Sequence, residues 1–174
     1  MRKRFVMEGV MLAIYGELLS PSEPVEYVLP LSTIYELDEI LQTTEPIMPD
    51  PADDRHVRDV LKDMIHYFSE PFKRKQMERA LVAPWSTITF PFQDHIQFTL
   101  IKASDPASWG ELFDPIETEL MVTAMRLHAS ILTDQVDWQE RMLQHEIPVQ
   151  FYDIEDFEFA LEVGNTLDTP PELK

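Results

Sequence analysis

Apolar residues recur at two different spacings along the chain, and the change from one to the other predicts where helices and strands lie. Four short apolar runs, at 5–12, 25–29, 129–132 and 149–152, are predicted to be buried strands. Stripes at helical spacing predict helices at about 33–41, 51–68, 72–81, 115–127 and 136–145, with a last helix reaching at most 162. This order of elements predicts an α/β protein with a mostly parallel central sheet.

Two of the predicted helices begin with an aspartate followed by a proline, at Asp50 and Asp114. An aspartate at this place accepts hydrogen bonds from the free amides of the first turn, and proline already has a helical φ. The spacing of Thr33 and Glu36 fits a capping box, in which each residue bonds to the other's backbone. Glu117, three residues after Asp114, fits the same pattern. Both glutamates are therefore open to a purely structural explanation.

Every second residue is apolar over much of 86–101, on either side of a polar turn at Asp94 and His95. This pattern predicts a β-hairpin. Pro91 has no amide to donate to a neighbouring strand, so the first strand of the hairpin is expected to have an exposed edge. We expect the hairpin and the helices before it to be an insertion at about 50–105 that packs onto the sheet. Covering a site and forming a homodimer contact are the alternatives.

Length and composition indicate one domain, expected at 1–165 and followed by a flexible tail at 166–174. The chain has 174 residues, of which 44% are hydrophobic, and contains no cysteine, which excludes disulfides and thiolate chemistry. No apolar run approaches the roughly 18 residues that a membrane-spanning helix needs. The start of the chain also lacks a signal-peptide pattern. We therefore expect a cytoplasmic protein without a membrane partner.

The net charge of −18 argues against a general affinity for nucleic acid, because binding to phosphates needs lysine and arginine. The bases are unevenly spread, however, and ten of the fourteen lie at 2–4 and 55–79. A local basic face is therefore predicted on the helix at 72–81, made of Lys73, Arg74, Lys75 and Arg79. An ordinary solvated helix face is the alternative explanation.

Several kinds of chemistry have no motif in this sequence. The four glycines form no phosphate-binding loop, the histidines lack metal-ligand spacing on a shared helix face, and no serine has a hydrolase context. What remains is a set of carboxylates at the ends of predicted strands, such as Asp134 after the strand at 129–132. Clusters of carboxylate oxygens select hard cations such as Mg²⁺ or Mn²⁺. Such a cation can activate a water molecule to attack a phosphodiester.

Two stretches of the chain resemble the PIN-domain family. The run Tyr27-Val-Leu-Pro-Leu-Ser-Thr-Ile-Tyr-Glu36-Leu is similar to the family's second strand and the helix after it. The stretch from Glu117 to Thr133 resembles the family's other signature, an acid followed by a helix, a strand and a threonine sixteen positions on. Glu8 then falls where the family has an aspartate at the end of its first strand, and 139–152 is similar to the closing helix and strand.

The resemblance implies a three-layer α/β fold and a cluster of acids that binds Mg²⁺ or Mn²⁺. The implied metal-binding and catalytic residues are Glu8, Glu36, Glu117 and Asp134. The sequence departs from the family pattern in three places: Glu8 and Glu117 are glutamates where the family has aspartate, and Gln135 stands where its fourth acid is usual. An added methylene would move carboxylate oxygens by roughly 1 Å, which matters for the near-octahedral geometry of Mg²⁺.

Two functions follow as hypotheses from different classes. The first is a metal-dependent endoribonuclease in which metal-activated water cleaves RNA and the basic helix holds the strand. The second is a PIN-like scaffold without catalysis that works as an intracellular binding or regulatory protein. The two differ in whether the four carboxylates meet around one point and whether any of them is neutralised by a neighbouring base.

Overall fold

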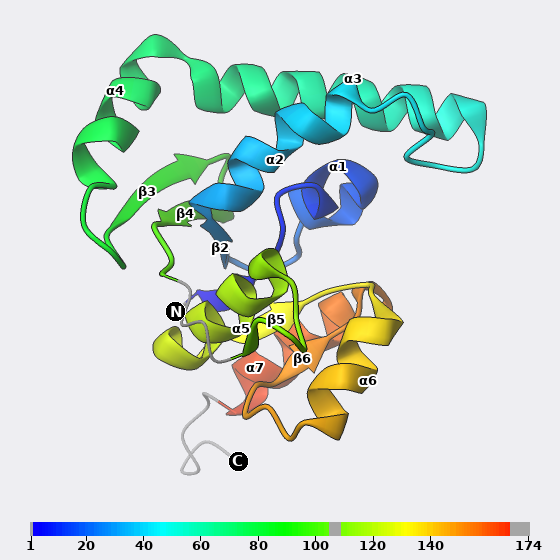
Figure 1. The fold of residues 1–174 in the computed structure, drawn as a ribbon, viewed down its shortest axis with the longest axis vertical. Helices are drawn as coiled ribbons and strands as arrows, with labels where there is room; N and C mark the ends of the chain where they lie inside the picture. The colour runs from blue at the N-terminus through cyan, green and yellow to red at the C-terminus, as the bar shows by residue number, and fades with distance from the viewer. Residues whose placement is uncertain (1, 105–108, 168–174) are drawn as a thin grey trace.

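A six-stranded sheet forms the centre of the molecule, and all of its neighbouring strands run parallel except β3 and β4 (Figure 1). The computed structural model describes residues 2–104 and 109–167. The strand order is β3-β4-β2-β1-β5-β6. The strands are β1 (Lys3–Val6), β2 (Val25–Pro30), β3 (Thr87–Phe92), β4 (Ile96–Ile101), β5 (Ser130–Leu132) and β6 (Phe151–Tyr152). The predicted mixed α/β fold with a mostly parallel central sheet is confirmed.

Helices cover both faces of this sheet, which gives three layers. They are α1 (Met11–Ile14), α2 (Leu31–Gln42), α3 (Pro51–Ser69), α4 (Pro71–Ala80), α5 (Pro115–Leu127), α6 (Val136–Gln144) and α7 (Phe157–Leu167), with short 3₁₀ turns at Gly16–Leu19 and Ile154–Asp156. Successive residues of β1 and β2 enter two different cores, because side chains alternate across a strand. Phe5 and Tyr27 belong to one core with α1, α2, α3 and α7. Val6 and Val28 belong to the other with α5 and α6.

The predicted helix starts at Asp50 and Asp114 are confirmed. The Asp50 carboxylate accepts from the Asp53 amide at 3.0 Å, and Asp114 forms a complete capping box with Glu117. The capping box predicted for Thr33 is wrong, because α2 begins two residues earlier and Thr33 lies inside it. Its hydroxyl instead donates to the Pro30 carbonyl and accepts from the Gly9 amide.

Strand β1 is shorter than predicted and ends at Val6 instead of continuing to residue 12. The Met7 amide still bonds to the carbonyl of Val28, and then the chain turns, with the Met11 amide bonding back to the Glu8 carbonyl. Residues 11 and 12 are therefore helical, and their apolar side chains are buried from a helix. This turn leaves Glu8 just beyond the carboxyl end of the strand.

The hairpin at 86–101 is part of the central sheet, since β4 pairs in parallel with β2 over six residues. β3 is the outermost strand, as Pro91 predicted. The last helix continues to Leu167, beyond the predicted limit of 162, so residues 166 and 167 of the expected tail are helical. The rest of that tail, from 168 on, lies outside the described residues. Within the described part of the chain, no helix is long and apolar enough to cross a bilayer.

Candidate functional site

Three of the predicted acids lie near the carboxyl ends of adjacent parallel strands. Glu8 follows β1, Asp134 follows β5, and Glu36 lies in α2, the helix that begins directly after β2. β1 is central and pairs with both β2 and β5. In open α/β sheets, ligands bind at the carboxyl ends of the strands, so this edge is where a site is expected.

Glu8 is the most perturbed acid at this edge. Its burial, followed by the negative charges of Glu36, Asp114 and Asp134, raises the pKa of Glu8 to about 7. Burial removes water from around the charged form, and like charges disfavour it further. The side-chain amide of Gln135 donates to Glu8 Oε1 at 3.0 Å and acts in the opposite direction. The structure thus brings Glu36, Asp114 and Asp134 within electrostatic range of Glu8.

Glu36 takes part in this cluster instead of capping its own helix. Burial raises the pKa of Glu36, and the nearby charges of Glu39 and Asp114 add to the effect. The Gly9 amide bonds to the Thr33 hydroxyl at 3.3 Å, which ties the turn that carries Glu8 to the first turns of α2. This hydrogen bond between a backbone amide and a side-chain hydroxyl holds the segment that carries Glu8 close to the helix that carries Glu36.

Asp134 is exposed and accepts a 2.5 Å hydrogen bond from the hydroxyl of Tyr15. Burial, together with this hydrogen bond and the charge of Asp134, raises the pKa of Tyr15 to about 12. The tyrosine therefore stays a neutral donor at physiological pH. It links the segment after α1 to the loop between β5 and α6.

Glu117 differs from the other predicted acids because it is held by a base. Only 6% of Glu117 is exposed. Arg141 of α6 donates a hydrogen bond to each oxygen of its carboxylate, from Nη1 to Oε1 at 3.0 Å and from Nη2 to Oε2 at 2.6 Å. The Asp114 amide adds a third hydrogen bond, to Oε1 at 3.0 Å. The hydrogen bonds that Arg141 donates to Glu117, together with the negative charges of Glu117 and Asp137, raise the pKa of Arg141 above its ordinary value. The charge that acts on Glu8 from this part of the chain is that of Asp114, the residue that caps the start of α5.

The sequence did not reveal the roles of Arg141 and Asp114. Arg141 lies 24 residues after Glu117, so no local pattern links the two. The one feature of the sequence that points to Arg141 is that it is among the few bases in an acidic half of the chain. Asp114 was recognised as a helix cap, and it also contributes negative charge at the strand edge. Across residues 2–104 and 109–167, no set of three or more His, Asp or Glu side chains is arranged to hold a metal ion.

The predicted nucleic-acid residues lie on α4, away from these acids. α4 packs against α3 and β3, and β3 is at the opposite end of the strand order from β5 and β6. Lys73 stacks 3.5 Å above the ring of Tyr67, and Arg74 pairs with Glu78 at 3.7 Å. Lys75 and Arg79 are exposed. The basic residues therefore form a separate feature and do not surround the acid cluster.

The sequence matches no protein-family model and no curated protein.

Proposed function

We propose that this protein is a PIN-like binding or regulatory protein in which the positions expected to hold a catalytic metal are held by its own side chains. The observation that carries the proposal is the two-pronged bond between Arg141 and the buried carboxylate of Glu117. A guanidinium matches a carboxylate through two parallel hydrogen bonds, which makes the pair directional and strong. Glu117 therefore already has a cationic partner.

A divalent cation at Glu117 would have to compete with this arrangement. Both carboxylate oxygens are in hydrogen bonds, and Oε1 also accepts from the Asp114 amide. A metal ion would lie beside the positive charge of Arg141, or would have to displace Arg141 and replace both of its hydrogen bonds to Glu117. The local electrostatics thus favour the internal ion pair over a bound metal.

Gln135 supports the same proposal at the other side of the site. The family resemblance places a fourth acid at this position, but the amide of Gln135 donates to Glu8. An amide donor stabilises the Glu8 carboxylate without adding a negative charge. One acid is therefore held by a guanidinium and another by an amide, and both partners are supplied by the polypeptide.

A metal-dependent ribonuclease is the second candidate, and the raised pKa of Glu8 favours it. Besides the burial of Glu8, the negative charges of Glu36, Asp114 and Asp134 raise its pKa, as expected for a group of acids whose mutual repulsion a bound cation would reduce. A Mg²⁺ or Mn²⁺ ion at this edge would activate a water molecule against an RNA phosphodiester. In this case Glu36→Ala removes Mn²⁺-dependent cleavage of RNA while the protein stays folded.

A thermal-shift titration with Mn²⁺, run beside an RNA-cleavage assay, separates the two candidates. A site occupied at about 100 times its Kd stabilises the fold by about 2.7 kcal/mol, which corresponds to a Tm increase of about 5–11 °C for a chain of this size. The binding-protein proposal expects no concentration-dependent increase at millimolar Mn²⁺ and no metal-dependent cleavage. An increase that is lost in Glu36→Ala, with cleavage lost in parallel, would reject it.

A further inference from the structure

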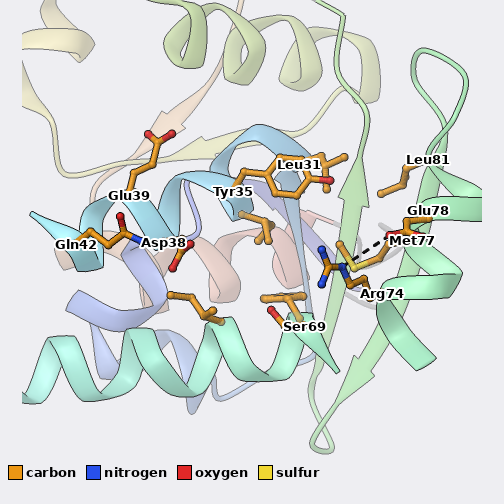
Figure 2. Close-up of a pocket in the computed structure, with 13 residues that line it drawn as sticks. Leu31, Tyr35, Asp38, Glu39, Gln42, Ser69, Arg74, Met77, Glu78 and Leu81 are labelled. Carbon is orange, nitrogen blue, oxygen red and sulfur yellow. Dashed lines mark ion pairs between the residues drawn. The ribbon is translucent and has the colours of Figure 1, made fainter. Parts of the chain in front are cut away.

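A groove of about 580 Å³ lies between α2 on one side and α3 and α4 on the other (Figure 2). One face of α2 lines its whole length, through Leu31, Ile34, Tyr35, Asp38, Glu39 and Gln42. These residues follow helical spacing over three turns, so the groove is about 16 Å long at 1.5 Å per residue. Its length and its two helical walls suit an elongated ligand that lies parallel to α2.

The two ends of the groove differ in chemistry. At the end near the start of α2, the lining is largely apolar and includes Leu31, Tyr35, Met77 and Leu81. Tyr35 is 65% exposed and lines the groove, so its ring is available to contact a ligand there. Arg74 at this end is paired with Glu78, as the dashed line in Figure 2 shows.

The end of the groove near the carboxyl terminus of α2 is acidic. Asp38 and Glu39 are both exposed there, and neither takes part in an ion pair among the described residues. The last turn of α2 contains no basic residue, so the negative end of the helix dipole adds to these two charges. This end of the groove therefore attracts positive charge.

We infer that the groove binds an amphipathic, basic helix of a partner protein. Its apolar side chains would lie over Leu31 and Tyr35, and a Lys or Arg about two turns away would meet Asp38 and Glu39. An amphipathic helix that lays its apolar face into a hydrophobic groove is a general mode of peptide recognition. This inference rests on the proposed binding function and gives the chemistry of its partner.

Charge favours a basic partner over a second copy of this chain. The protein has a net charge of −18, so the approach of two copies is opposed by repulsion between them. A basic helix is instead drawn to the groove, and complementary charge increases the rate of association more than it increases affinity. Binding is therefore expected to weaken as salt is raised.

Selection of helical peptides from a display library, followed by fluorescence anisotropy with one enriched peptide, tests the inference. Three variants are compared with the wild type: Tyr35→Glu, the pair Asp38→Lys and Glu39→Lys, and the control Phe72→Glu. Phe72 is 67% exposed on α4 but does not line the groove. All the changed residues are exposed, so circular dichroism is expected to show unaltered folding in each variant.

The enriched peptides are expected to combine apolar anchors with Lys or Arg about two turns apart. Tyr35→Glu should weaken binding about tenfold, as expected for loss of an exposed aromatic anchor. The double lysine variant should weaken it about fivefold and prefer a peptide whose basic residues are changed to glutamate. Phe72→Glu should bind like the wild type.

Peptides enriched without basic residues, or bound equally well by Tyr35→Glu, would overturn the inference. Light scattering that shows a dimer abolished by Tyr35→Glu would also overturn it and assign the groove to a second copy. Such failures are distinct from failure of the proposed function, which is tested by Mn²⁺ binding at residues that do not line the groove.

Discussion

Replacing Arg141 by glutamine removes the partner of a carboxylate that is almost wholly buried. The Glu117 side chain is 7% exposed and that of Arg141 is 29% exposed. Breaking a buried pair by removing one member costs roughly 3–5 kcal/mol, because an uncompensated charge stays behind. We expect about 3 kcal/mol for Arg141→Gln, at the low end, because water reaches Arg141 and the Asp114 amide still bonds to Glu117. For a chain of this length the Tm falls by about 6–12 °C.

Urea denaturation of a double-mutant cycle measures this coupling. Arg141→Gln and Glu117→Gln are made separately and together, and the double variant should be more stable than the sum of the single changes predicts by about 2 kcal/mol. Asp137→Asn is the matched control, because Asp137 also pairs with Arg141 but its side chain is 86% exposed, so its loss costs at most about 0.5 kcal/mol. Additive effects in the cycle, or an Arg141→Gln effect as small as that of the control, would refute the argument.

Two further predictions concern Glu8 and Asp50. The pKa of Glu8 is about 7, above its ordinary 4.5, so the stability linked to its protonated form is complete below about pH 4.5 and is lost as pH rises through 7. Glu8→Gln should therefore be more stable than the wild type at pH 8 by about 2 kcal/mol, after allowance for screening by water, and equally stable at pH 4. Equal unfolding midpoints for the two proteins at pH 8 would rule this out. Asp50→Ala should lower the stability of the fold by about 1 kcal/mol in urea, since it removes the cap of α3, whereas Asp53→Ala leaves the cap intact and serves as its control.

The sequence was sufficient for the elements that depend on local chemistry. Asp50 and Asp114 mark helix starts because their side chains bond to amides three residues away. Alternation of apolar residues likewise identified both strands of the hairpin. The same sequence pattern allows the hydroxyl of Thr33 either to cap a helix or to bond elsewhere. In the structure it donates to the Pro30 carbonyl and accepts from the Gly9 amide, which joins α2 to the turn at Gly9.

The place of the hairpin in the sheet and the pairing of Glu117 with Arg141 depend on contacts between residues far apart in the sequence. Local sequence patterns do not predict such contacts. β4 pairs with β2, which lies far from it in the sequence, from Val25 opposite Ile96 to Pro30 opposite Ile101. Pairing between strands so distant in sequence is decided by the packing of the whole sheet. Arg141 reaches Glu117 because α6 packs beside α5 in the same core. The sequence identified the acids, but only the packing of these helices shows which acid is neutralised.

The proposed function requires that side chains of the protein itself occupy the positions where the family resemblance places a metal. Electron paramagnetic resonance of a Mn²⁺ titration tests it most directly, since the signal of free Mn²⁺ falls when the ion binds to protein. We expect the wild type to leave the signal of free Mn²⁺ unchanged at micromolar Mn²⁺, and the combined variant Gln135→Asp and Arg141→Gln to lower it. If the wild-type protein removed one equivalent of Mn²⁺ from solution and Glu36→Ala did not, these acids would hold a metal ion and the proposed function would be wrong.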